Sequence, residues 1–352
     1  MTTIQILWQT IETQYNNGTF PVDQLEKMDV LVFSDNIENI RNGLTLMTTL
    51  APEYLCRYLK LNGGSMVLRE AGRFSAPLSA ERVLVEEAKG ASVWQDLYES
   101  GAFESMAFRA LGDVAIENLS KSEKAFCVRM AKEMVRIPAG DFERKGSKVI
   151  LSKDFLLFKY QVTQALWESV IGSNPSKFKG ANRPVEMVSW FDVVDFCNKL
   201  SKREGLEVAY IINGDDVACN WSSKGYRLPT QAEWEYSARA NQSFQYAGSD
   251  NVDEVAWYSN NSGDETHPVG QKKPNGFGIY DMSGNVDEWV WDWSGYSRPG
   301  QIDPTGPVRG SWRLRRGGGW RSRDFYSSIS ARYHYGPWVY DDALGFRLSR
   351  NL

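Results

Sequence analysis

Residues 274–293 read PNGFGIYDMSGNVDEWVWDW and decide the class of fold. The Pro-Asn-Gly at the start is typical of a tight turn, because proline presets one backbone angle and Asn and Gly tolerate left-handed ones. Trp289, Trp291 and Trp293 then follow at the two-residue spacing of a strand. Bulky aromatic side chains can build a core where regular elements are few. The stretch therefore predicts short strands and loops around an aromatic core.

Two capping boxes predict helices upstream of this stretch. Ser189 is followed by Asp192, and Thr230 by Glu233, so each cap can accept a hydrogen bond from the third helical residue. The first helix has one apolar face, made of Trp190, Val193, Val194, Cys197 and Leu200. The second is QAEWEYSARA, and a third, LWESVIG, ends at Gly172. Helices followed by short strands predict an α+β fold.

The first 132 residues differ from the rest of the chain in composition and periodicity. They predict a separate, helix-rich domain of unknown role. At 352 residues the chain is long for one domain. Apolar residues from Ile4 to Ile11 share one helical face, ERVLVEEAKG and KAFCVRMAKEM also indicate helices, and DVLVF and SMVLREA indicate strands. From Met134 onward the chain is rich in Trp, Gly and Asn. The predicted domains are therefore 1–132 and 133–352.

Composition and charge exclude several classes of protein. The formal charge of −4 argues against a general affinity for nucleic acid or anionic membranes. No run of about 18 apolar residues predicts a membrane span, and the first residues lack the pattern of a signal peptide. The four cysteines are scattered without a CxxC motif, which is typical of reduced, mostly buried thiols.

Six motifs occur together in a fixed order: MVRIPAGDF, KYQVTQALWESVIGSNPSKFKGANRPVEMVSW, YRLPTQAEWEYSARA, PNGFGIYDMSGNVDEWVWDW, RRGGGW and GFRL. From about Glu133 to Leu352 the chain resembles the formylglycine-generating-enzyme, or sulfatase-modifying factor, domain family. The resemblance implies a C-type-lectin-like fold, with a small twisted antiparallel sheet, two helices and much loop.

The catalytic residues that the resemblance implies are missing. Active members of the family carry two copper-binding cysteines after a GGSW-like turn, and here Ser322 and Ser327 lie near those positions, with no cysteine after Cys219. Serine cannot supply the thiolates that Cu(I) needs. The two histidines, His267 and His334, are too few for the His-rich iron site of related sulfoxide synthases, and no GxSxG motif occurs. We therefore expect no catalytic residues; the alternative is an enzyme or accessory protein of the family that acts without these cysteines.

We also expect no cofactor, with one alternative. In relatives, the segment matching Gly284–Glu288 can contribute oxygen ligands to calcium, and Asn285 and Glu288 are suitable hard donors. The interpretation that we favour is a tight turn whose Asn and Glu side chains cap neighbouring backbone groups. A second calcium loop of the family is shortened here, around Ser259–Glu265.

The end of the chain is similar to the variable proteins of diversity-generating retroelements. In those bacterial proteins a hypervariable region starts near an RGGSW-like turn and finishes with GFRL, which corresponds here to about residues 309–348. The three glycines permit a fixed turn of unusual geometry. Trp320, Ile329, Ala331, Leu344, Phe346 and Leu348 are predicted to be scaffold residues.

Between these scaffold positions lie residues typical of binding surfaces. Tyr and Trp offer large contact areas at low entropy cost, and Ser, Asp and Arg add adaptable polar contacts. The predicted ligand-binding residues are Arg321, Ser322, Arg323, Phe325, Tyr326, Tyr333, His334, Tyr335, Trp338, Tyr340, Asp341 and Asp342. Tyr-His-Tyr before Gly-Pro is expected to form an exposed loop. Ser311, Trp312 and Arg313 are weaker candidates, and the alternative for the aromatic residues is a place in the core.

The prediction is therefore a non-catalytic display protein that binds a protein or glycan target, on a cell surface if the resemblance to variable proteins holds. Five arginines, at positions 315, 316, 321, 323 and 332, favour nucleic acid instead, but the acidic chain and nearby aspartates argue against it. A third alternative is a regulatory module whose partner binds the N-terminal domain. The location stays open: the resemblance to variable proteins suggests export or surface exposure, whereas the first residues, without a signal-peptide pattern, suggest a cytosolic chain.

Overall fold

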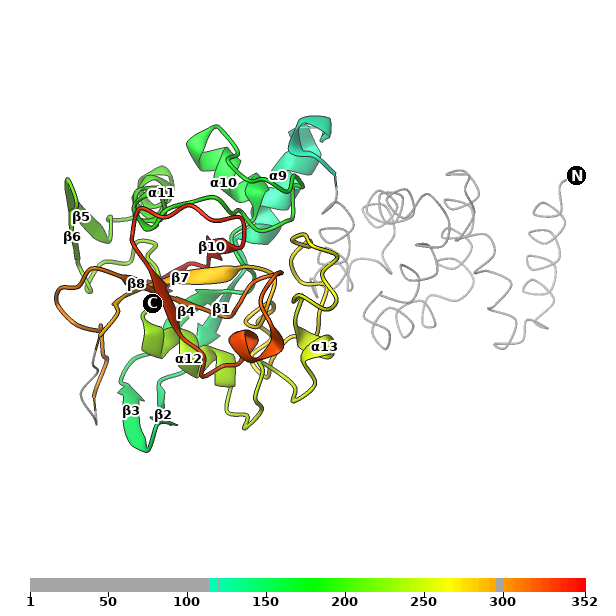
Figure 1. The fold of residues 1–352 in the computed structure, drawn as a ribbon. Coiled ribbons are helices and arrows are strands. Elements are labelled where there is room, and N and C mark those ends of the chain that lie inside the picture. The colour runs from blue at the N-terminus through cyan, green and yellow to red at the C-terminus, as the bar shows by residue number, and fades with distance from the viewer. Residues whose placement is uncertain (1–113, 120, 296–300) are drawn as a thin grey trace, which may run out of the picture. The chain divides into compact units, whose positions relative to one another are not determined.

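The computed structural model describes residues 114–119, 121–295 and 301–352, all within the second of two units into which the chain divides, Gly112–Leu352 (Figure 1). The elements predicted near Ile4 and in ERVLVEEAKG, DVLVF and SMVLREA lie outside these residues. The first described helix is α9 (Lys121–Ala131), which ends before its predicted limit because Met134 begins a strand. The domain boundary at residue 133 stays a prediction.

The described residues form four further helices and two short 3-10 turns. They are α10 (Gln164–Ile171), α11 (Trp190–Arg203), α12 (Gln231–Arg239), α13 (Val252–Val255), η3 (Ile116–Asn118) and η4 (Asp324–Ser327). No helix in the described part of the chain is both long and apolar enough to span a bilayer.

The predicted helix caps are confirmed. The Ser189 side chain accepts a hydrogen bond from the Asp192 backbone, the Thr230 side chain accepts one from Glu233, and both capping boxes are complete. At α10, Gly172 has a φ of 87°, the left-handed geometry that ends a helix. These local signals set where the helices begin and end.

Within the described part of the chain, the strands form two sheets and two hairpins. They are β1 (Met134–Ile137), β2 (Gly140–Arg144), β3 (Ser147–Leu151), β4 (Phe155–Phe158), β5 (Tyr210–Asn213), β6 (Asp216–Cys219), β7 (Asp287–Trp293), β8 (Arg313–Arg316), β9 (Tyr333–Tyr335), β10 (Leu344–Phe346) and β11 (Ser349–Asn351). One sheet has the order β1-β4-β11 and the other β10-β7-β8-β9, while β2-β3 and β5-β6 are hairpins.

Strand β7 lies inside the four-stranded sheet and carries the tryptophans of the opening motif. Trp289 and Val290 are both fully buried although they point to opposite faces, so each face of the sheet is covered. On the face of α11, the Trp289 indole donates to the Val188 carbonyl, and on the face of α12, Val290 packs in the core with Trp234. β10 pairs with β7 in parallel, whereas the other strand pairs are antiparallel.

A buried ion pair ties the two sheets together. The Arg347 guanidinium, which follows β10, donates to both carboxylate oxygens of Glu288 in β7, at 2.8 and 2.9 Å. The same guanidinium donates to the Phe158 carbonyl at the end of β4. Because both side chains are fully buried, removing either partner would leave a charge in the interior. The GFRL motif is therefore structural, as predicted.

Candidate ligand-binding surface

The glycine turn and the GFRL strand support the C-terminal segment from both ends. Gly317 and Gly318 have φ values of 94° and 71°. A Cβ on Gly318 would lie 2.7 Å from the Ser327 hydroxyl oxygen, and one on Gly319 would lie 2.9 Å from the Ala343 carbonyl oxygen. Since real Cβ atoms do not approach so closely, only glycine fits at these two positions. The turn is therefore held in one geometry.

The predicted scaffold residues are buried, with one exception. Trp320 is buried, and its indole donates to the Asp342 carbonyl at 2.8 Å while its ring meets Phe178 edge-on. The buried apolar side chains are Ile329, Leu344, Phe346 and Leu348, whereas Ala331 is half-buried. The scaffold prediction is confirmed for these residues, apart from Ala331.

The prediction that Tyr333–Tyr335 forms an exposed loop is wrong. These residues form β9, the edge strand of the four-stranded sheet, in antiparallel register with β8. The strand is too short to show an alternating pattern in the sequence, and its pairing with Arg313–Arg315 depends on residues about 20 positions away. Tyr333 and Tyr335 therefore project from one face of the sheet and His334 from the other.

Arg315 organises the aromatic residues on the face of β9 that carries the two tyrosines. Its guanidinium lies 4.3 Å from the ring centre of Tyr335 and 5.5 Å from that of Tyr333. The rings of Tyr326 and Tyr333 are 4.7 Å apart, and those of Phe325 and Tyr326 are 4.0 Å apart. These contacts make a continuous aromatic row across β8, β9 and η4.

Arg315 is fixed from below by a buried carboxylate. It forms an ion pair with Asp287 at the start of β7. Burial raises the pKa of Asp287 to about 6 in spite of this cation. From the sequence, Arg315 is a candidate only for contact with nucleic acid. No motif near it predicts that it lies between two tyrosines and an aspartate.

A second group of predicted residues is held by ion pairs. Arg321 binds Asp341 and Asp342 at 2.5 and 2.6 Å, and Lys177 binds Asp342 at 2.6 Å. Beneath them Glu186 is fully buried; one of its oxygens accepts from the Phe178 N–H and the other has no partner among the described residues. Burial raises the pKa of Glu186 to about 7.

The structure divides the twelve predicted residues by exposure, and we call the twelve together with Arg315 the C-terminal face. The exposed members are Arg321, Arg323, Phe325, His334, Trp338 and Tyr340. The half-buried members are Ser322, Tyr326, Tyr333, Tyr335, Asp341 and Asp342. Trp338 and Tyr340 are the most exposed aromatic members, at 63% and 57%. His334 lies apart from the tyrosines and meets the exposed ring of Trp312 edge-on.

Arg313 does not join this surface, contrary to the sequence expectation. It is buried, and its guanidinium lies 3.7 Å from the ring centre of Trp190 and 3.5 Å from that of Trp293. Burial lowers the pKa of Arg313 to about 9. Arg316 is also buried and pairs with Glu235. Both arginines are thus structural, and the aromatic cage around Arg313 is filled by the chain itself.

The positions that match the copper-binding cysteines hold serines that pack against the glycine turn, and the buried Ser327 hydroxyl has no hydrogen-bond partner among the described residues. The Ser322 hydroxyl accepts from the Gly319 N–H at 3.0 Å, and Ser327 is buried against Gly318. The described cysteines are unpaired thiols; Cys127 and Cys197 are buried and Cys219 is half-buried. Burial raises the pKa of Cys127 and of Cys219 to about 12, so both thiols are protonated at neutral pH.

The side chains considered as metal ligands make contacts with other residues of this chain. His267 lies in a loop, stacks on Trp257 and contacts the Ser262 carbonyl. The Asn285 side chain makes two hydrogen bonds to the His267 backbone, and Glu288 is paired with Arg347. The described residues contain no group of three or more His, Cys, Asp or Glu able to hold a metal. Calcium at Asn285 and Glu288 stays an untested alternative.

Short sheets held between helices, much loop, and strands from both ends of the described region in one sheet define a C-type-lectin-like domain. The family model for the sulfatase-modifying factor enzyme 1-like domain matches residues 120–352, and the chain belongs to this family. The predicted family and fold class are thereby confirmed.

Three similar proteins mark the range of the family. The chain is 39% identical over 255 residues to chaperone protein LppX of Paenibacillus barcinonensis, covering 61% of this chain and 88% of the relative. It is 29% identical over 245 residues to the formylglycine-generating enzyme of Streptomyces coelicolor, covering 60% and 70%. Among solved structures, Treponema denticola variable protein 1 is similar with a TM-score of 0.59 and 35% identity, covering 62% of this chain and 95% of that one. The predicted similarity to variable proteins is confirmed.

Proposed function

We propose that this chain is a non-catalytic display protein that binds a target through the C-terminal face. The observation that carries the proposal is the separation of roles along the segment. Gly318, Gly319 and the GFRL strand are fixed by close packing, while Phe325, Trp338 and Tyr340 between them stand exposed. A rigid frame with exposed aromatic and polar side chains is the arrangement that binding loops use.

The face suits recognition of a macromolecule. The aromatic row is ordered before binding by Arg315, so little conformational entropy is lost when a partner covers it. Arg323 is an exposed cation at its edge, and Asp324 beside it is an exposed anion, so the rim has mixed charge. A protein or a glycan target fits this chemistry. The proposal implies export or exposure at a cell surface, where such a target is accessible.

A display experiment tests the separation of roles. The codons for the six exposed residues of the C-terminal face are randomised together, and the library is sorted for folded display on yeast. We expect most members to fold, and clones that bind a defined protein such as hen lysozyme to emerge. As a matched control, randomising the buried positions Ile329, Leu344, Phe346, Leu348, Trp320 and Ser327 should abolish folded display. Equal losses in both libraries would contradict the proposal.

The neighbouring DNA provides an independent test. A variable protein should lie near a reverse-transcriptase gene and a near-identical template repeat that differs at adenines within the codons for about Trp312 to Phe346. If the gene and the repeat are both absent from the locus, the chain is a member of the sulfatase-modifying factor domain family but not a variable protein.

A second candidate is an accessory protein or enzyme of the family, favoured by the similarity to a protein named a chaperone and to formylglycine-generating enzymes. In the first form, the exposed aromatic residues would hold a client polypeptide. Suppression of aggregation of a reduced, unfolded test protein that is lost on Trp338→Ala would favour it. Copper- or iron-dependent turnover of a cysteine peptide above background would favour the enzyme and contradict the display proposal.

A further inference from the structure

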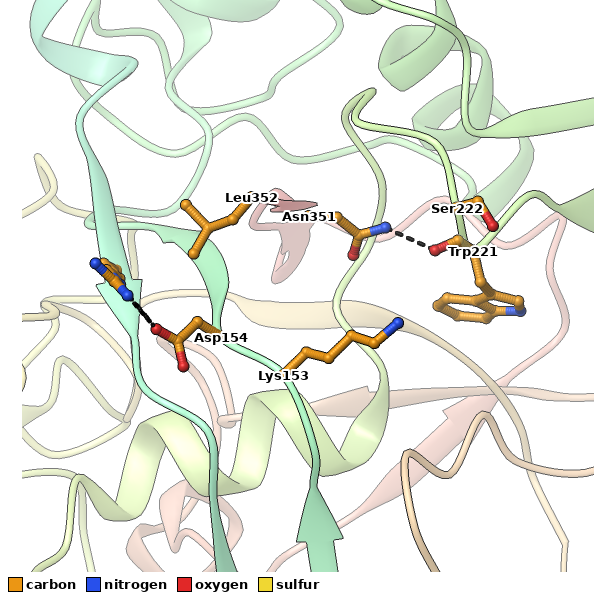
Figure 2. A pocket seen from close by; sticks show the side chains of 7 residues that line it. Lys153, Asp154, Trp221, Ser222, Asn351 and Leu352 are labelled. Atoms are coloured by element: carbon orange, nitrogen blue, oxygen red, sulfur yellow. Dashed lines mark hydrogen bonds and ion pairs between the residues drawn. The ribbon is translucent and has the colours of Figure 1, made fainter.

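A concave site lies beside the three-stranded sheet and shares no residue with the C-terminal face. Two adjoining hollows, of about 570 and 240 Å³, have Lys153, Asp154, Trp221 and Asn351 in common. Figure 2 shows the larger one, with the Lys153 side chain between Asp154 and Trp221 and its amine directed toward the indole. We call the two hollows together the Trp221 groove. The hollows fall at or near the size range of pockets that hold small ligands.

The floor of the groove is held in one arrangement. The Asn351 amide donates to the Trp221 carbonyl at 2.7 Å and accepts from the Arg227 guanidinium at 2.9 Å. Arg227 is buried and binds both carboxylate oxygens of Glu233 at 2.7 Å. The Trp221 ring meets Trp291 edge-on at 5.7 Å. The indole is therefore fixed, although 37% of Trp221 remains exposed.

Hydrogen-bond donors and acceptors line the groove together with the exposed indole. Lys153 is exposed and has no ion pair among the described residues, so its ammonium can donate. Asp154 already accepts from Arg136 and from the Ala139 N–H, which keeps its carboxylate ionised and oriented. Each carboxylate oxygen still has capacity to accept another hydrogen bond. Asp303, in the smaller hollow, accepts from the Ser152 N–H at 2.7 Å in the same way.

The charges in the groove balance one another. Lys153 and Arg136 are matched by Asp154 and Asp303, and Arg227 is matched by Glu233. A strongly charged ligand would be attracted by the side chains of opposite charge and repelled by those of the same charge. A ligand with many hydroxyl groups and one apolar ring face meets all three features: the exposed indole, the oriented carboxylates and the free ammonium.

We propose that the Trp221 groove binds a neutral saccharide. The C–H face of one sugar ring packs on the Trp221 indole, hydroxyl groups donate to Asp154 and Asp303, and Lys153 donates to a ring or hydroxyl oxygen. Binding needs no metal ion. The site is separate from the C-terminal face, so it gives the protein a second attachment point that does not depend on the proposed function.

Saturation-transfer NMR on the full chain tests the proposal. The probes are glucose, galactose, mannose, N-acetylglucosamine, maltose, lactose and cellobiose, with glucuronate as the charged comparison. We expect signal transfer to at least one neutral sugar, unchanged by EDTA. Trp221→Ala should weaken its binding by at least about tenfold, since an aromatic platform contributes at the level of a kilocalorie or more. The control is Ile211→Ala, at an exposed position on β5 outside both sites, which should bind the sugar as wild type does. Trp338→Ala tests whether the sugar lies on the C-terminal face instead.

Lys153→Ala serves as the second variant, because an exposed lysine can be removed without disturbing the fold. It should weaken binding several-fold even if Trp221→Ala fails to fold. The proposal is overturned if no neutral sugar shows transfer, if glucuronate binds better than glucose, or if binding survives both substitutions. Loss of binding in Trp338→Ala would also overturn it, because that result would place the sugar on the C-terminal face.

Discussion

The guanidinium of Arg315 lies 4.3 Å from the ring centre of Tyr335, and the same group pairs with Asp287 beneath it. One side chain therefore does two things. It neutralises a carboxylate in the interior, and it orders the aromatic row at the surface. Because planar guanidinium groups stack on aromatic rings and ammonium groups do not, Arg and Lys are not equivalent here.

Substitutions of Arg315 should separate these two roles. Arg315→Ala leaves Asp287 buried without its cation, so the free energy of unfolding should fall by about 3–5 kcal/mol. Arg315→Lys keeps the charge and should cost less than half of that loss. Urea unfolding at pH 7 measures both. If Arg315→Ala is as stable as wild type, the ion pair with Asp287 does not stabilise the fold.

The exposed and half-buried aromatic residues should differ in their effect on stability. Phe325→Ala, Trp338→Ala and Tyr340→Ala remove exposed rings and should each change the free energy of unfolding by about 0.5 kcal/mol or less. Tyr333→Ala loses the contacts with Tyr326 and Arg315 and should cost about 1–3 kcal/mol. Ile211→Ala, at an exposed position on β5, is the control. A large loss for the first three would place them in the core.

Local signals in the sequence were sufficient for much of the fold. The caps at Ser189 and Thr230 and the stop at Gly172 each act within four residues, so the helices they begin or end could be predicted. The alternation of Trp289 and Trp291 likewise identified β7. The GFRL strand and the glycine turn were recognised as structural because the family motifs mark them.

The features that the sequence did not predict depend on contacts between distant parts of the chain. Arg313 and Arg315 are two residues apart, yet one is buried among tryptophans and the other ends beside two tyrosines. The edge strand β9 exists only because β8 pairs with it. The Trp221 groove joins residues near positions 153, 221 and 351, and no local pattern brings these together.

Glu186 should make stability depend on pH. Its pKa is raised from 4.5 to about 7 in the folded protein because the carboxyl is buried, so the folded state holds the proton between these values while the unfolded state releases it. Stability therefore falls as pH rises from about 4.5 through 7. Asp342 is the nearby anion that adds to the effect, and Lys179 opposes it.

Glu186→Gln removes this titration. Relative to wild type, the variant should gain stability between pH 5 and pH 8 by up to about 3 kcal/mol. Urea unfolding of both proteins at the two pH values measures the difference. Other buried carboxyls, such as Asp281 and Asp292 with pKa values raised to about 6, are present in both proteins and cancel in the comparison. A stability difference that does not change with pH would contradict the prediction.

The glycine turn offers the sharpest test of the rigid frame. Gly318→Ala places a Cβ 2.7 Å from the Ser327 hydroxyl oxygen at a φ of 71°, so it incurs both a clash and a left-handed backbone; the free energy of unfolding should fall by about 3 kcal/mol or more. Gly146→Ala is the matched control, because its φ is 74° but nothing lies within 4 Å of the new Cβ. It should cost only about 1–2 kcal/mol. Adding Ser327→Gly should restore part of the loss in Gly318→Ala and none in Gly146→Ala. Equal losses for the two alanine variants would show that backbone strain alone, and not close packing against η4, holds the turn.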